Sequence, residues 1–441
     1  MSEERREIAA PMETEPQRMS ATAPVLTPRE RIRRLLRREP TDRIPNGLGG
    51  CETAGLHNLA YDTLKRILGV SDCRNRVCTF MNNAIFEPSV LEAMQGDTIL
   101  LGTKMCPSRF WGPQADREWK DLHIWGTTLQ VANDWSFRQD PDGSWWWDEE
   151  SRCVPGSLYF DVPPAEDSLE SFGTGEIPPP DEFKPSHELS EERLRKLEED
   201  ARFLYETTNY SIVCGEFVHD LQLRPGGTAR WWMAMVEEPD ICHEYLGKAC
   251  DAAIGHLKQI DQAVGKYCDF MMIADDIGGQ RGVTIGPDLW RRIYKPHYKR
   301  LFTEWRRTTN MKVCLHCCGS TVDVLDDLIE CGVDIYNPVQ ISAERMDPVA
   351  LQRRFGDRVI FYGGVLDVPL CLPWLSESEV YEQVKRNIEN LSRGGGYLFA
   401  GVHNLPGDLP EGHLRAFLQA WRDTRDRPDL TGSSPLEPAI T

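Results

Sequence analysis

Short apolar runs alternate with amphipathic helical segments along most of this 441-residue chain, and this alternation limits its fold more than any other feature. The runs are short and rich in β-branched and aromatic residues, as buried strands are, and the last five are the clearest. They cover residues 44–48, 98–101, 211–214, 270–274, 312–316, 334–337, 359–362 and 397–400. Strands that alternate with helices in this way predict a parallel sheet.

Eight strands of this kind predict an α/β fold that closes into a (β/α)8 TIM barrel, spanning residues 27–423. A doubly wound open sheet is the alternative, but no GxGxxG motif stands between a strand and a helix. In a barrel the chemistry lies at the carboxyl ends of the strands, so polar residues that follow the strands become the candidates for function.

Residues 105–186 interrupt the alternation. They are dense in tryptophan, carry a DPDG turn, and predict an antiparallel β insertion after the second strand, followed by a proline-rich linker loop. The tryptophans form either a substrate or partner surface or the small core of the insertion, and we favour the core. Residues 1–26 and 424–441 are expected to be tails, the first of them disordered.

The net charge of −19, from 50 basic and 69 acidic side chains, argues against binding to nucleic acid or to an anionic membrane. No stretch approaches the apolar length that crosses a bilayer, and the first residues lack the apolar region of a secretory signal. The 14 cysteines are then expected to be mostly reduced. We therefore expect a cytoplasmic protein without nucleic-acid or membrane partners.

The sharpest chemical signal is the run Cys314-Leu-His316-Cys317-Cys318-Gly at the end of the predicted strand 312–316. Side chains alternate along a strand, so Cys314, His316 and Cys318 share one face and Cys317 points to the other. An imidazole and a thiolate two residues apart make half of a tetrahedral zinc site. The alternative is a buried histidine among small buried thiols.

Two carboxylates also follow predicted strands. Asp276 comes after strand 270–274 and Glu216 after strand 211–214, and both are candidate catalytic groups. His403 follows the last strand at the same rim, where it or either carboxylate could complete a metal site.

Four further residues near the strand ends are candidate substrate-binding groups. Asn337 and Gln340 offer neutral hydrogen bonds, Gly364 allows close approach of a ligand to the backbone, and Gln280 follows Asp276 on the substrate side.

The segments LHCCGS, LIECGVDIYNPVQ, MDPVALQRRFGDRVIFYGGV and GGGYLFAGVHN resemble the uroporphyrinogen decarboxylase superfamily. The resemblance covers roughly residues 27–423 and is strongest after Phe270. It implies the (β/α)8 barrel. The superfamily includes a porphyrin decarboxylase and cobalamin-dependent methyltransferases, such as methylcobalamin:coenzyme M methyltransferase and the O-demethylating enzymes of anaerobic bacteria.

Two features distinguish these branches. The decarboxylases carry an arginine-rich RQAGRY motif after the first strand to hold substrate carboxylates, whereas residues 47–53 here read GLGGCET. The methyltransferases carry a zinc motif, HxC followed by a distant cysteine. His316 and Cys318 match its first part, and at the third position this chain has His403 in place of cysteine, with Glu216 and Asp276 as other candidates.

The resemblance therefore implies a zinc-dependent methyltransferase that moves a methyl group between a small methylated substrate and a corrinoid protein. Its cofactors would be zinc and a cobalamin carried by that partner. Two alternatives stay open. One is decarboxylation of an acidic tetrapyrrole that uses Asp276 and no metal, and the other is a non-catalytic barrel that binds partners through its tryptophan-rich insertion.

Overall fold

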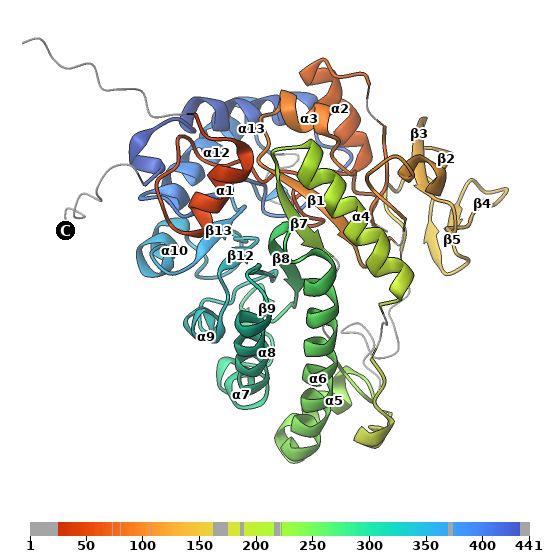
Figure 1. Ribbon diagram of the computed structural model, residues 1–441, viewed down its shortest axis with the longest axis vertical. Coiled ribbons are helices and arrows are strands. Elements are labelled where there is room, and N and C mark those ends of the chain that lie inside the picture. Colours follow the sequence, from red (N-terminus) through yellow and green to blue (C-terminus); the bar gives the residue numbers. More distant parts are fainter. Residues whose placement is uncertain are drawn as a thin grey trace, which may run out of the picture.

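The computed structural model describes residues 25–72, 74–79, 81–106, 108–161, 175–185, 189–215, 221, 223–368 and 374–432. They form an α/β fold in which a curled, seven-stranded parallel sheet is surrounded by helices (Figure 1). In spatial order the strands are β1 (Thr98–Thr103), β7 (Ser211–Gly215), β8 (Cys268–Ala274), β11 (Lys312–His316), β12 (Ile335–Asn337), β13 (Ile360–Tyr362) and β14 (Tyr397–Leu398).

The first predicted strand, 44–48, differs from the prediction because it forms one isolated bridge, Asn46 to Phe399, rather than a strand. Pro45 has no N–H to donate to a strand ladder, which shortens the pairing. Its carbonyl still accepts from the Phe399 N–H at 2.9 Å, and the Asp97 N–H donates to the Asn46 carbonyl at 2.8 Å. Segment 45–47 thus bonds to both outer edges of the sheet, an arrangement consistent with a TIM-like barrel.

The helices connect the strands and cover the outer face of the sheet (Figure 1). They are α1 (Pro28–Leu36), α2 (Asn58–Leu68), α3 (Pro88–Ala93), α4 (Glu191–Thr207), α5 (Thr228–Glu237), α6 (Pro239–Val264), α7 (Pro287–Ile293), α8 (Lys295–Thr308), α9 (Leu325–Cys331), α10 (Pro348–Phe355), α12 (Glu377–Ser392) and α13 (Glu411–Thr424). Thr27 and Glu30 form a capping box at the start of α1.

The alternation of side chains along the strands divides the core in two. One cluster, lined by residues such as Phe270, Met272 and Cys314, fills the inside of the curled sheet. The larger cluster contains the intervening residues, among them Met271 and Val313, and packs beneath the helices. Most side chains in the strands of the parallel sheet are therefore buried on one side or the other, as the apolar runs of the sequence predict.

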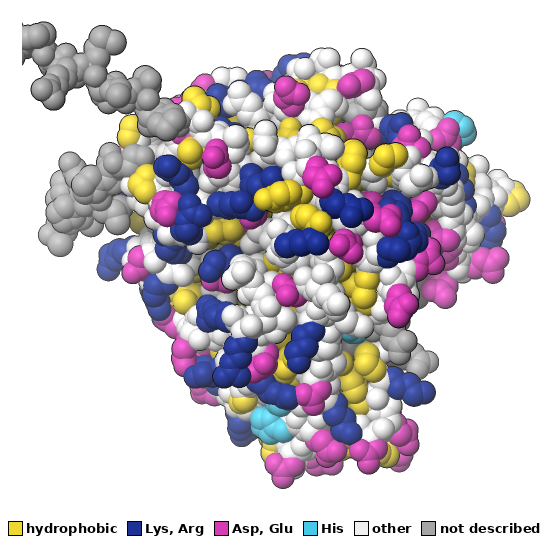
Figure 2. All heavy atoms as spheres, viewed as in Figure 1, with side chains coloured by type: hydrophobic (Ala, Val, Ile, Leu, Met, Phe, Trp, Pro, Cys, Tyr) yellow, Lys and Arg dark blue, Asp and Glu magenta, His cyan; other side chains and the backbone are white. Residues whose placement is uncertain are grey.

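A buried ionic network ties α1 to the start of β1. Asp97 is fully buried, and its carboxylate accepts from Arg31 at 2.5 Å, from Arg43 at 2.8 Å and from the Asn46 N–H at 2.7 Å. Arg31 also donates to Asp42 at 2.6 Å. Arg31 and Arg43 are thus paired with carboxylates of the protein itself. On the face shown in Figure 2, basic and acidic side chains are interspersed over the surface.

Antiparallel strands follow β1 and project from one side of the barrel (Figure 1). The hairpin β2 (Trp119–Ile124) and β3 (Thr127–Ala132) precedes a three-stranded sheet of β4 (Phe137–Gln139), β5 (Trp145–Trp147) and β6 (Ser151–Cys153). Aromatic rings pack on one another here, with 4.7 Å between the ring centres of Trp135 and Trp147.

Two short segments complete the description. A small hairpin, β9 (Gly278–Gly279) with β10 (Gly282–Val283), follows β8, and Gly279 bridges to Ser320 beyond β11. Residues 425–432, which lie in the predicted C-terminal tail, pack against the body of the protein, with Leu430 buried and the Thr41 N–H bonded to the Thr431 carbonyl. Within the described part of the chain, no helix has the length and apolar character needed to cross a membrane.

Candidate metal centre

The site is built at the carboxyl ends of three neighbouring strands. Parallel pairing sets His316, the last residue of β11, level with Ala274 of β8 on one side and Asn337 of β12 on the other. Cys317 packs in the outer cluster and Cys314 in the inner one, so the chain alternates as predicted. His316 and Cys318 consequently lie together at the open end of the barrel.

His403 joins this pair from the loop after β14. One ligand atom from each of His316, Cys318 and His403 lies within 4.8 Å of the others, the one such group of three found among the described residues. The two imidazole rings meet edge to face, with 5.2 Å between their centres. Of the three residues that the sequence offers for the third position, His403 lies beside this pair, and Glu216 lies outside the described residues.

Two of the three donor atoms lie at the spacing of a zinc site. Zinc lies about 2.0 Å from histidine nitrogen and about 2.3 Å from cysteine sulfur, so a tetrahedral ion holds two such donors about 3.6 Å apart. The distance from His316 Nε2 to Cys318 Sγ is 3.5 Å. Two imidazoles and one thiol leave a fourth tetrahedral position for a substrate atom, which is the ligand number of a catalytic zinc site.

Asn337 determines which nitrogen of His316 faces this centre. Its Oδ1 lies 2.8 Å from His316 Nδ1 and accepts from the Thr53 hydroxyl at 3.0 Å, while its Nδ2 donates to the Tyr362 carbonyl at 3.3 Å. Because Oδ1 can only accept, Nδ1 carries the proton and Nε2 presents its lone pair toward Cys318. A partner of this kind is typical of metal-bound histidines.

The pKa shifts at the centre follow from burial. Desolvation, together with the nearby His316, lowers the pKa of His403 to about 3. Burial likewise lowers the pKa of His316, so both rings are neutral near pH 7 and have lone pairs to offer. Burial, and then the charges of Asp276 and Asp367, raise the pKa of the Cys318 thiol to about 12. A cation at this point would supply the charge that a thiolate needs.

Replacement of Asn337 by alanine is expected to weaken zinc binding by about 10–100-fold, because His316 loses the acceptor that fixes its orientation. Competition with a chromophoric zinc chelator measures this change. Asn337→Asp keeps an acceptor oxygen and should restore most of the affinity. Equal affinity of the alanine variant and the unchanged protein would show that Asn337 has no positioning role.

Two other predicted residues hold the loop that carries Cys318. The Asp276 carboxylate accepts from the Cys318 N–H at 3.0 Å, and Gln340 Oε1 accepts from the Gly319 N–H at 2.7 Å. Gly319 has a φ of +80°, and a Cβ on it would lie 2.6 Å from the backbone of Gly278. This contact packs the loop that carries Cys318 tightly against the β9–β10 hairpin. The position of each loop therefore depends on the position of the other.

The remaining residues predicted from the sequence lie in different environments. Gln280 is exposed on the turn of the β9–β10 hairpin. Gly364 has a φ of +95° and packs against Val339, which leaves no room for a side chain. Glu216 lies outside the described residues. Reasoning from sequence missed Asp367, whose side chain is buried with one oxygen, Oδ2, lacking a hydrogen-bond partner among the described residues.

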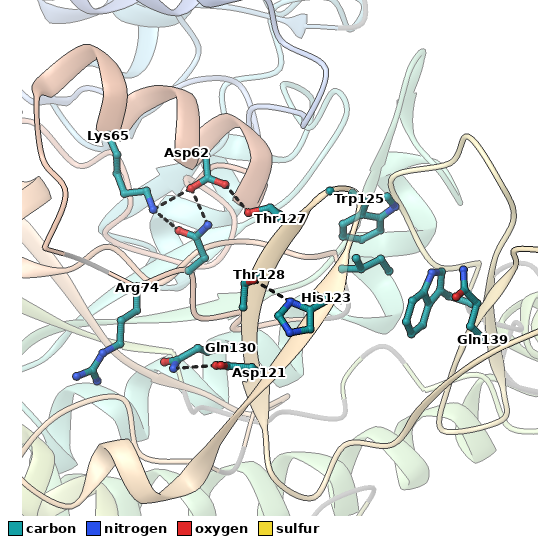
Figure 3. Close-up of a pocket in the computed structure, with 14 residues that line it drawn as sticks. Asp62, Lys65, Arg74, Asp121, His123, Trp125, Thr127, Thr128, Gln130 and Gln139 are labelled. Carbon is teal, nitrogen blue, oxygen red and sulfur yellow. Dashed lines mark hydrogen bonds and ion pairs between the residues drawn. The ribbon is translucent and has the colours of Figure 1, made fainter.

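A separate depression of about 920 Å³ lies between α2 and the β2–β3 hairpin (Figure 3). Its polar side chains bond to one another, since Asp62 accepts from Lys65 at 2.8 Å and from Thr127 at 3.1 Å, and Lys65 donates to Asn75 at 2.5 Å. None of the described candidate residues lines it. These bonds hold the hairpin against α2. The candidate functional residues lie at the strand ends and not in this depression.

A curled parallel sheet with a His–Cys–His group at the carboxyl ends of its strands defines a barrel-type α/β protein with a candidate metal centre. The family model described as Uroporphyrinogen decarboxylase (URO-D) matches residues 223–424, which include all three residues of the centre. This match confirms the resemblance to the uroporphyrinogen decarboxylase superfamily that the sequence predicts.

Solved structures resemble the chain only distantly. A methyltransferase from Methanosarcina mazei is 14% identical with a TM-score of 0.48, over 90% of this chain and 98% of that one. The α-L-fucosidase isoenzyme 2 from Paenibacillus thiaminolyticus is 12% identical with a TM-score of 0.29, over 52% of this chain and 39% of that one. At these scores the likeness carries no argument about function. Comparison with curated proteins gives no match.

Proposed function

We propose that this protein is a zinc-dependent methyltransferase that moves a methyl group between a small methylated substrate and a corrinoid carried by a partner protein. The observation that supports this most is the His316–Cys318–His403 group, whose donor types and spacing suit a zinc ion with one open position. The alternative branch of the superfamily fits less well, because residues 47–53 after the first strand position contain no arginine or lysine to hold tetrapyrrole carboxylates.

In this proposal His316, Cys318 and His403 bind the metal, and Asn337 keeps Nε2 of His316 directed at it. Zinc would act as a Lewis acid on the substrate atom in its fourth position. Asp276 and Gln340 hold the Cys318 loop, so the thiol stays aligned during turnover. The reduced corrinoid of the partner would supply the nucleophile for the methyl group, and the donor atom would keep the bonding electron pair.

A methyl-transfer assay tests this directly. Zinc-loaded full-length protein is mixed with a reduced corrinoid and a panel of methanol, methylated amines, methoxylated aromatics and methylthiols, and corrinoid absorbance reports methylation. His403→Ala is expected to reduce the rate by about 100-fold or more, because one of three protein ligands is lost. His123→Ala, which removes an exposed histidine of the β2–β3 hairpin, is the matched control and should leave the rate unchanged.

Two results would contradict the proposal. One is a transfer rate that His403→Ala and zinc chelation both leave intact. The other is release of carbon dioxide from an acidic tetrapyrrole such as uroporphyrinogen, without corrinoid and without metal, which would assign the chain to the decarboxylases of its superfamily.

A further inference from the structure

The buried carboxylate of Asp367, which follows β13, has a role that neither the sequence motifs nor the proposed function assigns. Its side chain is 3% exposed, and its Oδ2 has no hydrogen-bond partner among the described residues. A buried acceptor that is left unpaired is costly, and the cost is larger for a charged group than for a neutral one. Such an oxygen therefore indicates a ligand that brings a hydrogen-bond donor to it.

The backbone places Asp367 beside the candidate metal centre. The Val402 N–H donates to the Leu366 carbonyl at 3.0 Å, which joins the loop after β13 to the loop after β14. The residues that come next along these two loops are Asp367 and His403, so they lie on neighbouring segments at the same rim. One backbone bond thus keeps Asp367 close to a proposed metal ligand.

Asp367 is also within electrostatic range of Cys318. Burial raises the pKa of the Cys318 thiol to about 12, and the charges of Asp276 and then of Asp367 add to this rise. Asp367 is nevertheless outside the group of donor atoms that lie within 4.8 Å of one another, so it is not placed as a further ligand of the same ion. The carboxylate is therefore near enough to meet a molecule at the open metal position without occupying that position itself.

The charges around the centre favour an uncharged ligand over an anion. Asp276 and Asp367 contribute two negative charges, and burial keeps the rings of His316 and His403 neutral by lowering their pKa values. A divalent ion that is bound to the Cys318 thiolate beside these two carboxylates leaves no net positive charge for an anionic ligand. A neutral molecule that donates a hydrogen bond suits this environment better.

We propose that Asp367 determines substrate specificity: its Oδ2 accepts a hydrogen bond from a molecule whose reacting atom carries a lone pair for the open metal position and a hydrogen for Asp367. The substrate is then a small uncharged compound such as methanol or a free-base methylamine, rather than a methoxylated aromatic or trimethylamine. Methylthiols fit less well, since S–H is a weak donor. This inference rests on the proposed function and narrows its substrate class. When the methyl group passes to the reduced corrinoid, the donor atom keeps the bonding electron pair and its hydrogen, so the hydrogen bond persists in the product.

Two small probes test the hydrogen bond and the charge separately. Pyrazole binds a metal through one nitrogen and carries an N–H on the adjacent atom, whereas azide is an anion without a hydrogen. Each is titrated into full-length protein loaded with cobalt(II) in place of zinc, because the visible absorption of cobalt reports a ligand at the open position. Asp367→Ala is expected to weaken pyrazole binding by at least about ten-fold, because a charge-assisted hydrogen bond is lost. The same variant should strengthen azide binding by about ten-fold, because a negative charge is removed.

The opposite directions of these two changes distinguish the proposed role from a structural one, since damage to the centre would weaken both probes. Asp367→Asn keeps the shape and an acceptor oxygen but not the charge, so it should strengthen azide binding and change pyrazole binding by less than about three-fold. Asp357→Ala is the matched control, because Asp357 is largely exposed and precedes β13 at the other end of the barrel. Unchanged affinities in both Asp367 variants, weaker binding of both probes by Asp367→Asn, or no binding of pyrazole to the unchanged protein would overturn the proposal.

Methyl transfer separates this inference from the proposed function. If the two probes respond as expected but no donor of the panel transfers a methyl group, the proposed function is wrong, while Asp367 still selects the ligand of the metal. Zinc-dependent transfer from a methoxylated aromatic or trimethylamine as fast as from methanol or methylamine, at rates that Asp367→Ala leaves unchanged, would contradict the inference alone.

Discussion

Protein that carries His316→Ala together with Cys318→Ser is expected to purify without zinc, whereas the unchanged protein should contain about one zinc per chain. His316 Nε2 and Cys318 Sγ lie 3.5 Å apart, so the double replacement removes two of three neighbouring donors. A single remaining imidazole cannot hold zinc against dilution and washing. Elemental analysis of gently purified protein measures this directly.

The matched control is Cys317→Ala. Cys317 is adjacent in sequence but packs in the outer cluster, away from the centre, so zinc content should not change. Equal zinc in the double variant and the unchanged protein would mean that the metal sits elsewhere. Absence of zinc from both, even after zinc is supplied, would mean that these side chains serve packing alone.

Asp97→Ala is expected to lower the free energy of unfolding by about 3–5 kcal/mol, because it leaves two arginines without their buried counter-ion. Arg31 and Arg43 both donate to this carboxylate, and Arg31 is almost completely buried. The Asn46 N–H loses its acceptor as well, so the bonds that join segment 45–47 to β1 are weakened. Urea unfolding followed by circular dichroism gives the change.

Asp326→Ala provides the comparison for Asp97. Asp326 also pairs with two arginines, Arg354 and Arg358, but all three side chains are about half exposed to solvent. Exposed pairs contribute about 1 kcal/mol or less. A similar loss of stability for both variants would show that burial of the Asp97 network adds nothing.

The sequence predicts the strands best where apolar residues run unbroken. The strands that end at Ala274, His316 and Asn337 lie where the pattern places them, since only a buried parallel strand accommodates such runs. The segment 44–48 has a similar composition, but Pro45 and the glycines that follow it reduce its pairing to one bridge. Residue hydrophobicity does not report whether a backbone N–H is available.

The metal centre was predictable in part for a similar reason. Alternation along one strand is a local property, so it predicts that His316 and Cys318 share a face. His403 reaches them only through the curvature of the whole sheet, which no local pattern encodes. The sequence predicted Asn337 as a substrate-binding residue, and the structure shows it fully buried and bonded to His316. This bond depends on the register between two neighbouring strands, which the sequence of one strand does not give.

The close contact between Gly278 and Gly319 restricts how the sequence of this protein can evolve. Each glycine lies where a Cβ would meet the other loop's backbone, at 2.7 Å from the Cys318 carbonyl for Gly278 and at 2.6 Å from Gly278 for Gly319. A mutation that enlarges either position would displace the thiol of the metal centre. The two loops must therefore diverge together in descendants, and lineages that alter one are expected to carry a compensating change in the other.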